Sequence, residues 1–314
     1  MPLKHIFLVT LVPLIWGIQA VMLKIGLGQF PPIFMVGMRF SLMAVLLAPF
    51  LSGIRGKLGP ALLVSATQGI AHFSLLYIGF QYTDVSAGII AYQTNAIFTI
   101  MLGAILLKER VSVISFLGVM LAFAGVGLIV GAPKGEASLT GLLIIIGSAL
   151  MFAIGNIIAR RFGPFKTTAL NATVSLGSTI GLLVISALTE TGQWHAVQSA
   201  NWQGWGALLY TSLIGGIAGF SIWYWVLNRY SVDRIAPFGL LMPMFAMAGS
   251  VTLLNEQITS LHLLGAAFTI GGVAIAQFGP RMLAAWRTRK VLAESAARRA
   301  LGQDVCGQDV GRKE

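Results

Sequence analysis

The sequence is a succession of apolar runs separated by short polar, glycine- or proline-containing breaks. Each run is roughly 20 residues long, enough to cross the roughly 30 Å hydrocarbon core of a bilayer as an α-helix. The runs predict an all-α integral membrane protein with ten spanning helices, near residues 6–26, 33–52, 60–82, 85–107, 111–130, 140–159, 167–188, 204–228, 232–254 and 261–282.

The chain repeats itself after 147 positions. Residues 253–257 (LLNEQ) follow the pattern of residues 106–110 (LLKER), and the same shift carries Gly118 onto Gly265 and Gly125 onto Gly272. The second copy has lost both positive charges. Cytoplasmic loops are rich in Lys and Arg, so the two copies are predicted to face opposite sides of the membrane. Such inverted repeats are typical of secondary transporters.

A weaker correspondence, shifted by 136 positions, relates Trp16-Gly17 to Phe152-Ala153. Five spans per half is an odd number, so the second half must be inverted relative to the first. We therefore expect two inverted five-helix repeats, residues 1–133 and 134–282, around a central cavity. Residues 283–314 are expected to be a basic cytoplasmic tail. Its part from Arg287 to Arg299 is either a short amphipathic helix on the inner leaflet or disordered, and the polar end after Leu301 is expected to be disordered.

Composition supports a membrane protein over a soluble or nucleic-acid-binding one. Hydrophobic residues make up 56% of the 314 residues and charged residues 10%, with a mean hydropathy of +0.84. The net charge of +11 does not indicate nucleic acid. If both termini are cytoplasmic, all Lys and Arg residues except Lys24, Arg39 and Lys134 lie at the inner side, facing the negatively charged inner leaflet.

No cofactor, metal or catalytic group is indicated. The single cysteine, Cys306, lies in the polar tail, which leaves no disulfide framework or thiolate metal site. The predicted spans hold no carboxylate pair, His-Glu metal motif or nucleophile with its base. We expect no enzyme activity. The expected partners are a small-molecule solute and the lipid bilayer, with no nucleic acid; the oligomeric state stays open, a monomer included.

Several short motifs occur in order on the predicted spans. They are Trp16-Gly17 and Lys24 in span one, Pro31-Pro32 before Arg39-Phe40 in span two, a Glu-containing turn followed by Leu-Gly in each half, and Pro243 thirteen residues before Glu256. In this order the chain resembles the ten-helix EamA-type branch of the drug/metabolite transporter superfamily. One departure is Ala96, where the counterpart of Pro243 would be proline, so span four is expected to be straighter than span nine.

The resemblance implies a cavity ringed by spans from both halves and the export of metabolites or drugs. By pattern the chain is similar to bacterial amino acid exporters, including cysteine/O-acetylserine and aromatic amino acid exporters, which implies the bacterial inner membrane. All ten acidic residues fall at span ends, in loops or in the tail. Because proton- and sodium-driven carriers usually keep a carboxylate within the membrane, we expect facilitative export of amino acids by alternating access. The alternatives are broad drug efflux and a non-transporting membrane sensor.

Polar and aromatic side chains within the spans are the candidates for binding a solute. The expected substrate-binding residues are His72, Tyr92, Asn95, Trp223, Gln19, Asn156, Phe238 and Met242. His72 either contacts the solute or only bridges two helices, and Trp223 either lines the cavity or belongs to an interfacial aromatic cluster. Arg39 either binds a carboxylate or, as we favour from the sequence, snorkels or pairs with Asp84 at the outer rim.

Reporter fusions test the inverted topology. A fusion after Arg110 should report the cytoplasm and one after Gln257 should report the periplasm, because only the first hairpin carries positive charges. Compartment-specific reporter activity in cells is the measurement. If both hairpins report the same side, the inverted-repeat argument fails.

Overall fold

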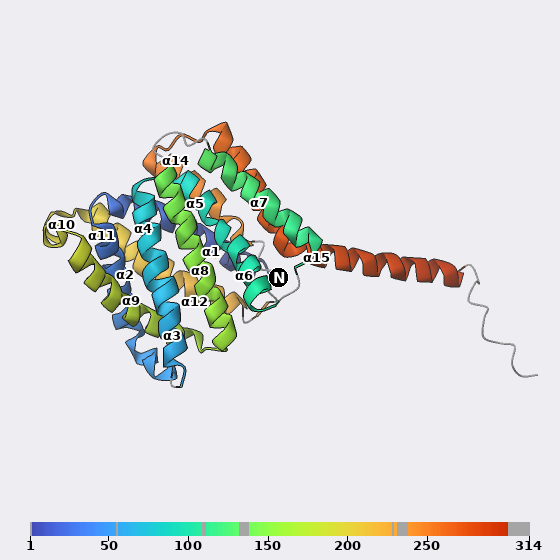
Figure 1. Ribbon diagram of the computed structural model, residues 1–314, viewed down its shortest axis with the longest axis horizontal. Coiled ribbons are helices and arrows are strands. Elements are labelled where there is room, and N and C mark those ends of the chain that lie inside the picture. Colours follow the sequence, from blue (N-terminus) through green and yellow to red (C-terminus); the bar gives the residue numbers. More distant parts are fainter. Residues whose placement is uncertain are drawn as a thin grey trace, which may run out of the picture.

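The computed structural model describes residues 2–54, 56–108, 111–131, 138–227, 229–230 and 238–300, and every regular element in these ranges is a helix (Figure 1). The elements are α1 (Leu3–Leu27), α2 (Pro32–Leu47), η1 (Ala48–Ile54), α3 (Leu58–Val64), η2 (Ser65–His72), α4 (Phe73–Gln81), α5 (Val85–Tyr92), α6 (Thr94–Leu106), α7 (Val113–Gly131), α8 (Leu139–Phe162), α9 (Thr167–Thr189), α10 (Gln193–Ser199), α11 (Trp202–Leu209), η3 (Tyr210–Ala218), α12 (Gly219–Leu227), α14 (Met242–Leu254) and α15 (Ser260–Ala300).

Within the described residues, eight helices are long and apolar enough to cross a membrane. The two shorter apolar helices, 113–129 and 242–254, lie where spans five and nine are predicted. The helical membrane-protein fold expected from the sequence is confirmed. Spans two, three, four and eight each consist of consecutive segments, such as α3, η2 and α4 in span three.

The last span does not end at the predicted position. α15 continues through Pro280 to Ala300 and projects away from the bundle (Figure 1, red). Residues 283–300 are therefore helical as an extension of span ten. The part of the predicted tail from 301 onward lies outside the described residues.

Spans three and eight each contain a π-helical segment. η2 runs from Ser65 to His72 and η3 from Tyr210 to Ala218. The 147-residue shift carries Ser65 onto Ser212, so the two segments occupy nearly equivalent positions. A π-helical turn widens the backbone and re-aims side chains, and such turns occur often at functional sites.

Span four is interrupted at Gln93, between α5 and α6, although it lacks a proline. Two side chains bond to backbone carbonyls beside the break: Thr94 Oγ1 donates to Ala91 O and Asn95 Nδ2 donates to Tyr92 O, both at 2.7 Å. Span four is therefore interrupted without a proline, and side-chain hydrogen bonds to the backbone accompany the break. That span four is straighter than span nine stays a prediction. Residues 232–237 of predicted span nine lie outside the described ranges.

The repeat is visible in the backbone where spans four and nine end. Lys108 and Asn255 are the two described non-glycine residues with positive φ, at 55° and 57°. The 147-residue shift relates one to the other. A left-handed residue commonly ends a helix, so both copies of the repeat stop the span in the same way.

The pair α7 and α15 shows the inversion directly. A Cβ at Gly118 would lie 2.6 Å from Gly272 O, and one at Gly125 would lie 2.7 Å from Gly265 O. Higher numbers on α7 thus meet lower numbers on α15, so the helices run antiparallel, side by side at the edge of the bundle (Figure 1). Gly118 faces Gly272, which is the repeat equivalent of Gly125, and Gly125 faces Gly265, which is the repeat equivalent of Gly118. A two-fold axis relating the repeats produces this arrangement. The boundaries of the two repeats remain a prediction.

Replacing Gly272 with alanine should destabilise this pair. The added Cβ would meet Ala122 N at 2.3 Å, and overpacking of this kind costs about 1–3 kcal/mol. Gly271→Ala is the matched control, because a Cβ there meets nothing within 4 Å. We expect a lower melting temperature in detergent for Gly272→Ala only. Equal melting temperatures for the two variants would contradict the close packing.

Candidate functional site

An internal cavity of about 260 Å³ lies between spans of both halves. Its walls come from α1, α2, η2, α4, α5 and α6 of the first half and from α8, α12 and α14 of the second. The lining residues are Trp16, Gln19, Ala20, Leu23, Arg39, His72, Phe73, Leu76, Phe80, Ile89, Tyr92, Gln93, Asn95, Phe152, Phe220 and Met242. The walls are mostly aromatic and aliphatic, with a few amide, hydroxyl, imidazole and guanidinium groups.

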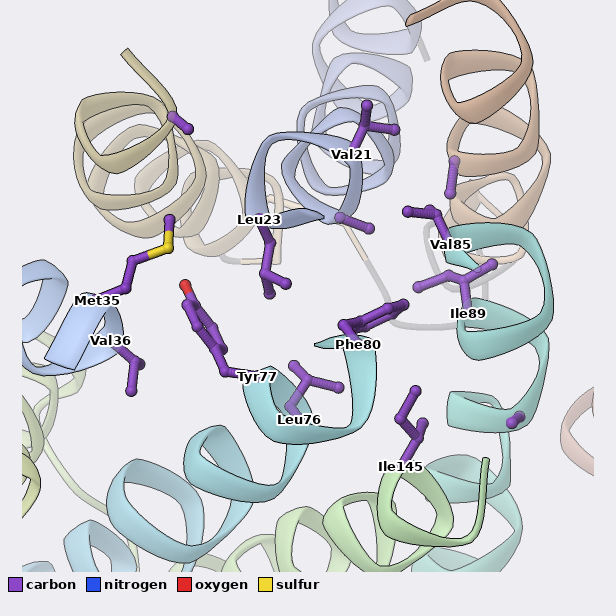
Figure 2. Packing of buried hydrophobic residues seen from close by; sticks show 14 of the residues in the cluster. Val21, Leu23, Met35, Val36, Leu76, Tyr77, Phe80, Val85, Ile89 and Ile145 are labelled. Carbon is purple, nitrogen blue, oxygen red and sulfur yellow. The ribbon is translucent and has the colours of Figure 1, made fainter. Parts of the chain in front are cut away.

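One end of the cavity is closed by packed side chains. Figure 2 shows Phe80 of α4 lying between Leu23 of α1 and Ile89 of α5. All three are buried, with exposed fractions of 2% or less. We call this the outer end, because the predicted topology places it toward the periplasm.

Two charged side chains hold the turn between α4 and α5 at the outer end. Lys24 Nζ donates to Phe80 O and Thr83 O, both at 2.9 Å. Glu256 accepts from Val85 N at 2.6 Å and from Ser86 N at 3.0 Å. The ammonium stabilises a helix C-terminus and the carboxylate a helix N-terminus, each matching the sign of the helix dipole. The turn is thus tied to both α1 and the α14–α15 loop.

His72 bridges two helices and also lines the cavity, so the two sequence interpretations are compatible. Its Nδ1 lies 2.8 Å from Ser148 Oγ and 3.2 Å from Ser148 O, on α8. A carbonyl oxygen only accepts, so we assign the proton to Nδ1. The imidazole is stacked on the Tyr92 ring with centroids 5.6 Å apart. The bridge fixes the ring orientation against the cavity wall.

Four further candidate residues lie in the cavity wall: Gln19, Tyr92, Asn95 and Met242. Tyr92 and Asn95 flank the break in span four, and the Asn95 amide is held by its bond to Tyr92 O. Gln19 packs against span eight, where a Cβ at Gly215 would lie 1.8 Å from its Oε1. Only glycine at position 215 leaves room for this side chain.

Three candidates lie outside the set of lining residues. Asn156 accepts from Gln68 Nε2 at 2.7 Å and donates to Thr99 at 3.4 Å, so it bridges helices beside the cavity. Trp223 lies behind the lining residue Trp16, and the centroids of the two rings are 5.7 Å apart. Phe238 packs with Trp223 against a small cluster around Val9 and Val226. Whether these residues affect binding of a solute stays a prediction.

The snorkelling interpretation of Arg39 is wrong. Its side chain is 1% exposed and lines the cavity. The guanidinium lies over Phe73, with Cζ 4.6 Å from the ring centroid. The signal was available in the sequence, because a charged group inside a span avoids lipid and turns toward the protein interior.

The sequence interpretation also missed Trp16, Gln93, Phe152 and Phe220 as lining residues. Trp16 was a motif residue, and its Nε1 donates to Gly215 O at 3.1 Å, which aligns the indole beside Phe220. Gln93 sits at the break in span four. No pattern in the sequence indicates which face a broken helix presents.

The electrostatic character of the cavity is simple. Among the described lining residues, Arg39 is the only Lys or Arg and none is Asp or Glu. Among the described residues, no three His, Cys, Asp or Glu side chains gather in a group that would hold a metal ion. The arrangement fits recognition of a small solute by ring faces, neutral hydrogen bonds and one cation.

Comparison with known proteins identifies related chains. The sequence model of the EamA-like transporter family matches residues 3–131 and again residues 139–278. The chain is 30% identical over 289 residues to a protein of Salmonella typhimurium named "Probable amino-acid metabolite efflux pump", covering 89% of this chain and 96% of that one. A protein of the same name from Escherichia coli is 30% identical over 290 residues, covering 89% and 95%.

Two further comparisons concern an uncharacterized protein and a solved fold. An uncharacterized transporter of Bacillus subtilis is 28% identical, covering 85% of this chain and 94% of its own. A protein of known crystal structure matches with a TM-score of 0.63 at 18% identity, over 88% of this chain and 99% of its own. At that identity the match shows the fold alone.

The His72–Ser148 bridge gives a stability prediction. Ser148→Ala removes the hydroxyl that also donates to His72 O at 3.0 Å, so it should destabilise the protein by about 1 kcal/mol. Ser74→Ala is the control, because Ser74 Oγ is buried without a hydrogen-bond partner and its loss should be neutral or stabilising. Melting temperatures in detergent are the measurement. A larger loss for Ser74→Ala would contradict the assigned network.

Proposed function

Because the chain belongs to the EamA-like transporter family, we propose that it exports amino acids with aromatic or other neutral side chains, and related small metabolites. The protein is a multi-pass membrane transporter and not an enzyme. We further propose that it lies in a bacterial inner membrane with both termini in the cytoplasm, in keeping with the charge distribution of its loops.

The cavity is the observation that carries this proposal. Its volume of about 260 Å³ lies just below the usual range for ligand pockets, about 300–1,000 Å³, and so favours a small metabolite over a drug-sized solute. Its walls offer ring faces to an apolar side chain and amide groups to polar atoms. The alternative of broad efflux of cationic drugs is disfavoured, because none of the lining residues that the structure describes is acidic.

Alternating access is supported by where the cavity lies. Spans of both halves contribute to its wall, so a rocking motion of one half against the other would expose it to each side in turn. The closed outer end, with Lys24 and Glu256 across the α4–α5 turn, corresponds to one such state. Opening would require these contacts to separate.

The mechanism is proposed to be facilitative. The described carboxylates Asp84, Glu190, Glu256 and Glu294 lie at helix ends, in loops or beyond the last span. Glu190 and Glu256 each accept from two backbone amides at a helix start, which gives both a structural role. A carrier with no carboxylate relay moves its solute down the solute's own gradient.

Transport by purified protein tests the function. Liposomes should take up radiolabelled L-phenylalanine without an imposed proton or sodium gradient, and collapse of the pH and voltage differences should leave the initial rate nearly unchanged. Strict dependence on a proton gradient would refute facilitation, and His72→Gln would then test the histidine as the coupling group. A protein that binds amino acids yet moves none would support the sensor alternative.

Two methionines on α14 supply a matched control for the cavity. Met242 lines the cavity, whereas Met244, two residues along the same helix, is 57% exposed on the outside of the bundle. Met242→Trp should fill the cavity and abolish uptake. Met244→Trp should leave uptake unchanged. Uptake that survives Met242→Trp would exclude this cavity as the route.

A further inference from the structure

Arg39 is a buried cation whose hydrogen-bonding capacity is incompletely used. Its guanidinium lies against two ring faces, with Cζ 4.6 Å from the Phe73 centroid and 5.6 Å from the Phe40 centroid. Nη1 is 3.5 Å from the Tyr77 hydroxyl, at the limit of a hydrogen bond, and Nε is buried without a partner. None of the described residues that line the cavity with Arg39 is acidic. The contacts around Arg39 therefore stabilise its charge only in part.

A carboxylate is the group that completes this environment. A buried charge is costly unless it is paired and hydrogen-bonded, and the planar guanidinium offers a fork of donors that matches two carboxylate oxygens. Ring faces attract the cation weakly and leave its in-plane donors unused. A solute carboxylate entering the cavity would supply the missing negative charge and the missing acceptors together.

The part of the wall that the structure describes offers no carboxylate to a solute ammonium group. The polar lining groups besides Arg39 are the amides of Gln19, Gln93 and Asn95, the Tyr92 hydroxyl, the His72 imidazole and the Trp16 indole. These are neutral partners at most, and an ammonium group would also be repelled by Arg39 at low dielectric. The phenyl and indole rings favour an apolar or aromatic remainder of the solute.

We propose that the cavity recognises its solute through a carboxylate held by Arg39, and that the solute's amino group is dispensable. The substrate class is then small monocarboxylates with an apolar or aromatic side chain. Aromatic 2-oxo and 2-hydroxy acids belong to it alongside the amino acids. This inference rests on the proposed function, since it concerns the solute of the same cavity.

Three probes that share a phenyl ring test the proposal by binding to the purified full-length protein. L-phenylalanine carries both charged groups, 3-phenylpropanoate only the carboxylate, and phenethylamine only the ammonium. By isothermal titration calorimetry, 3-phenylpropanoate should bind at least as tightly as L-phenylalanine. Phenethylamine should bind at least about 10-fold more weakly, because it lacks the charge-assisted hydrogen bonds to Arg39.

Variants of Arg39 separate recognition from packing. Arg39→Gln should weaken binding of 3-phenylpropanoate by about 10- to 100-fold and leave phenethylamine binding no weaker. Arg39→Lys keeps the positive charge but not the forked donors of the guanidinium, so the affinity for 3-phenylpropanoate should fall less than in Arg39→Gln. Arg161→Gln is the matched control: Arg161 is exposed at the end of α8, and the order of the three affinities should not change.

The outcomes are distinguishable from failure of the proposed function. Carboxylate preference without uptake of any amino acid into liposomes would reject the function and keep the binding inference. Phenethylamine binding as tightly as 3-phenylpropanoate would overturn the inference, as would a carboxylate preference that survives Arg39→Gln. If Arg39→Gln fails to fold, the order of affinities in the unaltered protein and in Arg39→Lys decides.

Discussion

A peptide group that leaves a helix where protein covers it from water needs a protein partner, and Thr83 to Val85 of the α4–α5 turn are buried in this way. The α4–α5 turn shows how much of the structure depends on this constraint. Its free carbonyls are taken by Lys24 and its free amides by Glu256, which come from spans far apart in the sequence. Satisfying the backbone therefore also ties the two halves together where the cavity is closed.

The inverted repeat builds a nearly symmetric scaffold and an asymmetric cavity. On the symmetric side, Gly118 of α7 packs on Gly272 of α15, and Gly125 packs on Gly265. The spans around the cavity share the scaffold but not the side chains: Gln19 of span one packs on Gly215 of span eight, whereas Gln68 of span three packs on Gly155 of span six and bonds to Asn156. The described polar lining groups all come from the first half, whereas lining rings come from both halves.

Sequence reasoning placed four polar residues toward the interior because polar side chains in lipid are costly. Gln19, His72, Tyr92 and Asn95 had to face the protein interior, and all four line the cavity. The same argument, applied consistently, would have placed Arg39 there. Asn156 also faces the protein interior, but its amide bonds to Gln68 and Thr99 on neighbouring helices and does not line the cavity.

The sequence by itself determined the helical membrane fold, the number of spans and the repeat, because apolar length and the 147-residue periodicity are properties of the chain alone. Only the tertiary structure decided which interior face meets the cavity and which meets a neighbouring helix. Trp16 lines the cavity, whereas Trp223 lies behind it. Both are aromatic residues within apolar spans. Their difference depends on the rotation of each helix, which close packing at positions such as Gly215 sets, and no local pattern records it.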